Sequence, residues 1–143
     1  MTAYIDTSAL AKCYVREPRS LQVLDWAERQ GKPATAALTL VEFRCLLARR
    51  RRAGQIDTAF EQRALAAFDG HVRDGAWQLQ PLALGDHAAA RDLIDIVADH
   101  PLRALDALHL AAARACGATD FATADKQQAE AAATLGFTVH RFY

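Results

Sequence analysis

Short apolar runs alternate with longer stretches of helical spacing along this chain, and this alternation limits the folds open to it more than any other feature. Strands separated by helices need crossover connections, which produce a mostly parallel sheet. The runs that favour strands are residues 2–5, 34–38, 77–82, 121–123 and 137–142. The stretches that favour helices are residues 8–14, 19–30, 40–53, 58–72, 86–98, 103–116 and 126–135. The sequence therefore predicts an α/β fold.

Length and charge narrow the class of protein. The chain has 143 residues, which suits one domain over residues 1–143. Its 17 basic and 17 acidic residues give a formal net charge of 0, so a uniformly basic nucleic-acid binder is excluded, although a local basic patch is not. No segment approaches the roughly 20 apolar residues of a membrane span, and the first residues do not form a signal peptide. We expect a cytoplasmic protein without a membrane partner.

The three cysteines do not form a recognisable metal or disulfide pattern. Cys13, Cys45 and Cys116 are widely spaced and none belongs to a CxxC pair, which argues against a zinc knuckle or a disulfide framework. Each lies in an apolar helical pattern, so we expect buried, reduced thiols.

Two aspartates come directly after expected strands. Asp6 follows the first apolar run and Asp125 follows the fourth. Ligands bind at the carboxyl ends of the strands in a parallel α/β sheet, so both positions favour function. A helix N-cap is the alternative for Asp6, but Thr7 and Ser8 could also provide that cap. Asp120 precedes the fourth run and is interpreted as a surface or turn acid at the opposite end of the sheet.

Two further acids lie near expected helix starts. Glu42 stands three residues after Thr39, which is also the signature of a capping box, and taken alone this capping role is the stronger interpretation. Asp106 would be favoured near the positive end of a helix dipole. Its neighbours are almost all apolar, however, so a solvated surface acid fits poorly.

Four carboxylates that meet in one pocket need a counter-charge. Two unit charges about 4 Å apart repel by roughly 4 kcal/mol at an effective dielectric constant of 20. Either the acids take up protons or a cation neutralises them. Because oxygen ligands select hard cations, Mg²⁺ is the expected ion, and Mn²⁺ should substitute for it. Such an ion suits phosphate chemistry.

These acidic segments make the chain resemble a PIN-domain nuclease, and more narrowly the VapC toxins of bacterial type II toxin–antitoxin pairs. The segments at residues 6–12, 38–42, 106–111 and 123–125 resemble the four acidic motifs of the family in order and spacing. The resemblance covers nearly the whole chain. It implies a PIN-like three-layer sandwich, in which about seven helices flank a five-stranded, mostly parallel sheet.

The resemblance also implies an activity and partners. It implies Mg²⁺- or Mn²⁺-dependent cleavage of RNA, a homodimer, and inhibition by a VapB-like antitoxin. Asp6 and Asp106 would bind the metal directly, and Asp125 would complete the site, directly or through water. Glu42 would orient or deprotonate the attacking water. Ser8 or Thr123 could hydrogen-bond a carboxylate, although a helix cap or a bond at the sheet end accounts for each hydroxyl equally well.

Other residues carry open alternatives. A dense basic run could contact RNA phosphates, or it could be a solvated helix end; its candidate residues are Arg44, Arg49, Arg51 and Arg52. His109 could act as a general acid or base, but a packed helix histidine is the simpler interpretation. An apolar groove that could accept an antitoxin helix would be lined by Leu21, Leu24, Ala27, Leu46 and Leu47.

Two other functions remain open at this point. The chain could be a PIN nuclease that processes RNA without an antitoxin. It could also be a Rossmann-like phosphate-binding module such as a phospho-acceptor receiver, for which Asp6 and Lys126 are superficially suitable. A receiver, however, needs a second acid at the first strand and an acceptor aspartate after the third, and neither is present.

Overall fold

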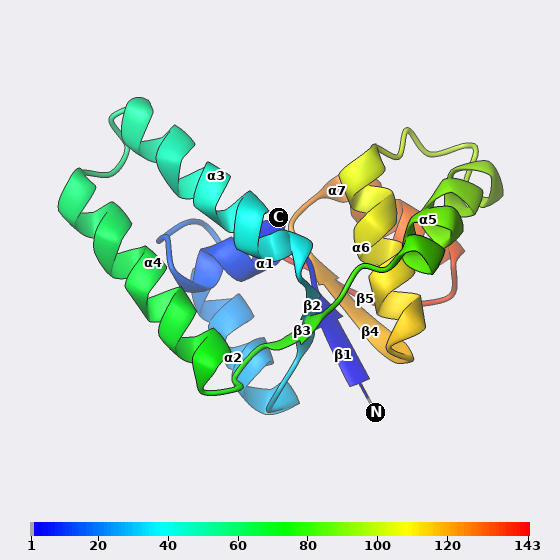
Figure 1. Cartoon of the computed structure of the whole chain (residues 1–143), viewed down its shortest axis with the longest axis horizontal. Coiled ribbons are helices and arrows are strands. Elements are labelled where there is room, and N and C mark those ends of the chain that lie inside the picture. Colours follow the sequence, from blue (N-terminus) through cyan, green and yellow to red (C-terminus); the bar gives the residue numbers. More distant parts are fainter. Residues whose placement is uncertain (1) are drawn as a thin grey trace.

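The computed structural model describes residues 2–143 and has one sheet of five strands (Figure 1). The strands are β1 (Thr2–Ile5), β2 (Ala34–Ala36), β3 (Gln78–Gln80), β4 (Ala118–Thr123) and β5 (Thr138–Arg141). Every neighbouring pair is parallel, so the expected α/β class is confirmed and the sheet is entirely parallel.

Seven α-helices connect these strands within the described residues. They are α1 (Thr7–Leu10), α2 (Ser20–Gln30), α3 (Leu38–Arg52), α4 (Thr58–Arg73), α5 (Leu84–Ile96), α6 (Ala104–Ala115) and α7 (Lys126–Thr134). A short 3₁₀ helix, η1 (Ala11–Cys13), extends α1. None of these helices, within residues 2–143, has the length and apolar character needed to cross a membrane.

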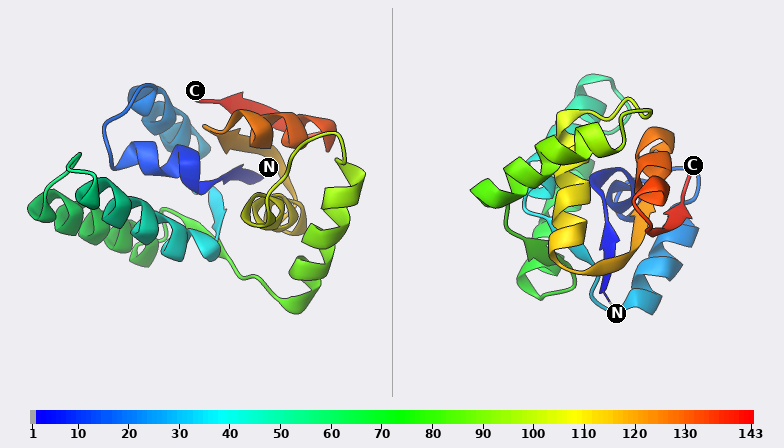
Figure 2. Two further views of the ribbon diagram at one scale, coloured as in Figure 1. Left: turned by 90° about the horizontal axis from the view of Figure 1, so that it is seen from above. Right: turned by 90° about the vertical axis from the view of Figure 1, so that its right-hand side faces the viewer.

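The helices cover the two faces of the sheet and form a three-layer sandwich. Figure 1 shows α1 to α4 on one side of the sheet and α5 to α7 on the other. The alternation of side chains along β1 explains this, because Ala3 and Ile5 join the core under the first group, whereas Tyr4 joins the core under the second. Helices α3 and α4 lie side by side and project from the body as an arm (Figure 2).

The strand order places a switch point between β1 and β4. The order is β3-β2-β1-β4-β5, so the chain moves outward from β1 in one direction through β2 and β3, then returns to the other side of β1 with β4 and β5. In open α/β sheets, the crevice outside the carboxyl ends of the strands at such a point is the usual ligand site. Asp6 and Asp125 follow these two strands.

Several expected boundaries differ from those observed. The first expected helix, 8–14, is shorter, because α1 ends at Leu10 and the chain tightens into η1. The second expected strand, 34–38, is two residues shorter, because Ala37 is already the N-cap of α3 and α3 begins at Leu38.

The fourth strand is longer than the expected residues 121–123, so that Asp120 lies inside the strand instead of before it. β4 begins at Ala118 because that residue pairs with Thr2, and Asp120 pairs with Ala3 and Thr138 inside the sheet. Tertiary pairing has overridden the low strand propensity of an aspartate. Asp120 is therefore a strand residue whose Oδ1 lies 2.7 Å from His140 Nε2, rather than a turn acid.

Candidate active site

Asp6 is held at the end of β1 by donors from three directions. Its Oδ1 accepts hydrogen bonds from Ser8 Oγ at 2.6 Å and from the Ala9 backbone N–H at 3.1 Å. Its Oδ2 accepts one from Thr123 Oγ1 at 2.5 Å. Asp6 is thus itself the N-cap of α1, which corrects the expectation that its neighbours could take that role.

Burial changes the pKa of the Asp6 carboxyl. The residue is only 4% exposed, and loss of water raises the pKa of its carboxyl. His109 and the three hydrogen-bond donors oppose that rise without cancelling it. A carboxylate in this position is stabilised by a nearby positive charge, which is the chemistry of a metal ligand.

Asp125 and Asp6 are connected by the hydroxyl of Thr123, which hydrogen-bonds to both residues. Thr123 Oγ1, which donates to Asp6, accepts a hydrogen bond from the Asp125 backbone N–H at 3.0 Å. Asp125 Oδ1 caps α7 by accepting from the Gln128 N–H at 2.9 Å. Its other oxygen, Oδ2, takes no part in that cap.

Asp106 and Asp125 are brought together by one guanidinium. Arg103 Nε donates to Asp106 Oδ2 at 3.2 Å, and a terminal nitrogen of the same side chain lies 3.6 Å from Asp125 Oδ2. The amide of Gln128 reinforces this contact by donating to the Asp106 backbone carbonyl at 3.0 Å. The starts of α6 and α7 therefore present two carboxylates toward a common cation.

Glu42 is the half-buried end of a chain of hydrogen bonds that leads into the core. Its Oε1 accepts from Thr7 Oγ1 at 2.7 Å and lies 2.5 Å from His109 Nε2. The other ring nitrogen of His109 lies 2.7 Å from the Tyr4 hydroxyl. If that hydroxyl donates to Nδ1, Nε2 carries the proton and donates to Glu42, which gives every group in the chain a partner.

This chain of hydrogen bonds decides two of the alternatives left open by the sequence. The capping box is absent, because α3 has Ala37 at its N-cap without a side-chain bond, and Thr39 bonds to Thr7 and Thr35 instead. His109 is 2% exposed and packed, as the simpler interpretation held. Burial raises the pKa of Glu42, but the His109 and Thr7 contacts outweigh it, so the pKa is lowered overall and Glu42 is ionised at neutral pH.

The four acids therefore lie in one region, and each has its own donors. The charge of Arg103 attracts three of them, Asp106, Asp125 and Glu42, and Asp6 is joined to Asp125 through Thr123. Within residues 2–143, no three His, Cys, Asp or Glu side chains are gathered closely enough to form a complete metal site. The donor set is nevertheless entirely oxygen and lies at the switch point of the sheet, so it fits a hard divalent ion.

Sequence reasoning missed Arg103, Thr7 and Tyr4. Arg103 had a usable signal, because it stands three residues before Asp106, and residues at that spacing meet on a helix surface. Thr7 and Tyr4 had none, because their contacts with Glu42 and His109 span 35 and 105 residues of sequence.

The basic run divides into paired and unpaired arginines. Glu61 on α4 binds Arg51 Nε at 2.9 Å and Arg44 at 3.4 Å, and Arg50 pairs with Glu17. Arg49 and Arg52 are exposed, and neither forms an ion pair with any residue of the described chain. The free charges therefore lie at the distal end of α3.

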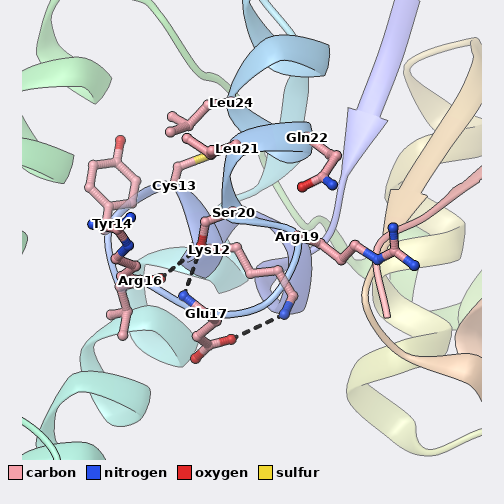
Figure 3. A pocket seen from close by; sticks show the side chains of 11 residues that line it. Lys12, Cys13, Tyr14, Arg16, Glu17, Arg19, Ser20, Leu21, Gln22 and Leu24 are labelled. Atoms are coloured by element: carbon pink, nitrogen blue, oxygen red, sulfur yellow. Dashed lines mark hydrogen bonds and ion pairs between the residues drawn. The ribbon is translucent and has the colours of Figure 1, made fainter.

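A surface pocket elsewhere does not compete with the acids as a reaction centre. Its volume is about 450 Å³ and it is lined by side chains of residues 12–24 (Figure 3). Lys12 Nζ donates to Glu17 at 3.2 Å and to the Pro18 carbonyl at 2.9 Å. Because Arg50 also pairs with Glu17, the acid of this pocket is already neutralised.

Comparison with known proteins identifies the family of this chain. The PIN domain family model matches residues 3–134, and the chain belongs to this family. Ribonuclease VapC47 of Mycobacterium tuberculosis (strain CDC 1551 / Oshkosh) is 33% identical over 114 residues, which cover 77% of this chain and 73% of that protein. The expected family and nuclease class are thereby confirmed, and the phospho-acceptor receiver is set aside.

A solved structure shows the same architecture. The crystal structure of Mycobacterium tuberculosis VapC20, described as a Sarcin-Ricin loop cleaving toxin, superposes with a TM-score of 0.70. The match has 20% sequence identity and covers 91% of this chain and 95% of that one. At this identity the match supports the three-layer fold.

Proposed function

We propose that this chain is a divalent-metal-dependent endoribonuclease that hydrolyses phosphodiester bonds of RNA and acts as the toxin of a VapBC-type toxin–antitoxin pair. The observation that carries the proposal is the position of Asp6 and Asp125 after the two strands at the switch point, with Asp106 joined to Asp125 by Arg103. The family match and the ribonuclease relative support it. The proposal includes a cytoplasmic location, since that is where the RNA substrate of such a toxin is found.

Three aspartates would hold the ion. Asp6, Asp106 and Asp125 supply oxygen ligands from three separate elements, and Mg²⁺ is the ion that such ligands prefer, with Mn²⁺ as its substitute. When bound, the ion polarises the phosphoryl oxygen and lowers the pKa of a water molecule. Ser8 and Thr123 fix the orientation of Asp6 through their hydrogen bonds to its two oxygens.

Glu42 is suited to accept the proton of the attacking water. Its hydrogen bonds from Thr7 and His109 both go to Oε1, and no side chain of the described residues bonds to Oε2. Its lowered pKa keeps the carboxylate ionised at neutral pH, which is the state that can accept a proton, although the same lowering makes Glu42 a weaker base than an ordinary glutamate. His109 and Thr7 position it, while Oε2 remains available.

Replacement of one proposed ligand tests the activity. We expect Asp106→Asn to reduce RNA cleavage by about 100-fold or more, since loss of a charged ligand weakens both the ion site and charge stabilisation in the transition state. EDTA should have a similar effect on the wild type. Asp120→Asn is the matched control, because it removes the same charge from β4, where Asp120 pairs with His140 outside the site. Equal cutting by wild type and Asp106→Asn would overturn the proposal.

The antitoxin and the dimer belong to the same proposal. Leu21 and Leu24 on α2 are 75% and 45% exposed, and Ala27 and Leu46 are partly buried, which leaves apolar surface for a partner helix. Leu47 is fully buried in the core, so the sequence-based expectation that it lines such a groove is wrong. A short neighbouring reading frame whose product binds this chain and blocks cleavage would support the toxin role. A functional nuclease without one would favour RNA processing.

A further inference from the structure

We propose that Arg103 is a built-in competitor for the divalent ion, and that metal binding requires its guanidinium to leave the space between Asp106 and Asp125. The inference rests on the proposed function, because it assumes that these two aspartates hold the ion. It adds a residue that sets the concentration of divalent ion at which the site is filled.

The contacts of Arg103 fit this role. Its Nε lies 3.2 Å from Asp106 Oδ2, and its terminal nitrogen lies 3.6 Å from Asp125 Oδ2. A single positive group thus spans two carboxylates that come from different helices. An ion bound by the same two oxygens would be repelled by the guanidinium at this distance, so the two cations compete for one position.

The exposure of the three side chains shows which of them can move. Asp106 and Asp125 are 17% and 32% exposed, whereas Arg103 is 77% exposed. Arg103 stands at the N-cap of α6 without a side-chain cap bond, so its side chain can leave without loosening the helix. Ion pairs of such exposed side chains are weak and sensitive to salt. A divalent ion, with twice the charge, can therefore displace the guanidinium.

The arrangement has a functional consequence. Without an ion, Arg103 offsets part of the repulsion between Asp106 and Asp125, and Asp125 keeps its position as the cap of α7. The same attraction reduces the apparent affinity for the ion. Arg103 therefore raises the concentration of Mg²⁺ at which the nuclease becomes active.

Direct measurement of metal binding tests the competition. Mn²⁺ is titrated into wild-type protein and Arg103→Gln, and binding is followed by electron paramagnetic resonance or calorimetry at low ionic strength. We expect the variant to bind Mn²⁺ about three- to tenfold more tightly, which is the range that the loss of weak exposed ion pairs allows. Arg29→Gln is the matched control, because Arg29 forms an exposed ion pair with Asp25 on α2 and the net charge changes equally.

The outcomes separate this inference from the proposed function. Unchanged or weaker Mn²⁺ binding by Arg103→Gln, with normal binding by wild type, overturns the inference alone. Equal tightening in Arg29→Gln also overturns it, because the effect would then come from net charge. Wild-type protein that binds no Mn²⁺ overturns the inference and the proposed metal site together.

Discussion

At the scale of single residues, the Thr123 hydroxyl positions two acidic residues, Asp6 and Asp125. Its Oγ1 donates to Asp6 and accepts from the Asp125 N–H, and Ser8 Oγ lies 3.3 Å away. Ser8 in turn accepts from the Ala124 N–H at 2.9 Å. The two acids at the switch point are thus held by two strand ends that are paired with each other, so their geometry follows from the register of β1 and β4.

The pair formed by Asp120 and His140 gives a pH-dependent prediction. The hydrogen bond from His140 lowers the pKa of Asp120, with burial opposing it. A lowered carboxyl pKa adds stability that is complete above the ordinary aspartate pKa of about 3.9 and is lost as the pH falls through the lowered value. We expect Asp120→Asn to cost about 0.5–1 kcal/mol at pH 7.

The measurement is urea unfolding of wild type and Asp120→Asn at neutral and at strongly acidic pH. The difference between the two proteins should shrink in acid, because Asp120 is then protonated in both the folded and the unfolded wild type. A difference that stays constant across this range would show that the pair does not contribute through charge.

Individual site residues differ in how far the sequence could predict them. Asp6 and Asp125 could be predicted as site residues, because an acid directly after a strand of a parallel sheet lies at the edge where ligands bind. The partners of Glu42 were not, because the contact with His109 joins positions 67 residues apart, and only the crossing of β1 under α6 brings Tyr4 to the same ring. The sequence pattern of Thr39 and Glu42 pointed to a cap because capping boxes are local, whereas both side chains bond to Thr7, more than 30 residues away in the sequence.

At the scale of elements, the arm formed by α3 and α4 connects the acids to the basic run. Glu42 lies near the start of α3, and a rise of about 1.5 Å per residue places the arginines at its end roughly 10–15 Å away. Phe43 and Phe68 pack across the arm with ring centroids 4.9 Å apart, and Glu61 adds its bonds to Arg44 and Arg51. The arm is thus a continuous two-helix surface that begins at the candidate site.

RNA binding along this arm gives a prediction about which arginines contribute. The double variant of Arg49 and Arg52 to Gln should bind RNA more weakly and reduce the slope of log K against log[salt] by about 1.4, since each lost phosphate contact on a single strand contributes about 0.7. Arg44→Gln should change the slope less, because Arg44 is paired with Glu61. Filter binding or fluorescence anisotropy over a range of salt concentrations provides the slopes, and an unaltered slope in the double variant would rule out this contact surface.

Element boundaries were predictable where a local signal was strong. The long helices α2, α4 and α6 lie within a few residues of their expected ranges because amphipathic spacing and terminal glycines define them. β2 was misjudged at its end because α3 begins at Leu38, and β4 was misjudged at its start because its pairing with β1 extends back to Ala118. Cys45 was expected to be buried but is exposed, since the face of α3 that it occupies points away from the core.

At the scale of the whole molecule, two hydrophobic cores lie on opposite faces of the sheet. Tyr4 and Phe121 stack within one of them at 5.4 Å, and Ile5 and Phe43 lie in the other. Helix α6 packs against β2 and β4, so the position of Asp106 depends on the sheet as a unit. The parallel sheet followed from the alternation of runs, whereas the strand order β3-β2-β1-β4-β5 and the packing of the two cores depend on contacts between distant segments that the alternation does not specify.

Coupling of metal binding to global stability gives a prediction for the whole molecule. An ion that binds only the folded protein, at about 100 times its Kd, adds roughly 2.7 kcal/mol to the free energy of unfolding. We expect Mn²⁺ at such an excess to raise the Tm by several degrees in the wild type. Asp106→Asn should lose most of this shift in a thermal scan, and retention of the full shift would place the ion elsewhere.

Asp6 and Asp125 each cap a helix with one oxygen of a carboxylate that the proposed chemistry also needs. Exchange for alanine would remove a negative charge and at the same time uncap α1 or α7. An alanine variant would therefore lose activity and folding stability together. Asparagine keeps the capping oxygen and removes the charge by replacing the other oxygen with an amide NH2 group, so at position 6 the Thr123 hydroxyl would have to accept rather than donate. Asparagine at either position is therefore the best choice for an inactive, properly folded protein with which to capture RNA or an antitoxin. We expect few natural substitutions at both positions, because the helix cap and the proposed chemistry each require the side chain.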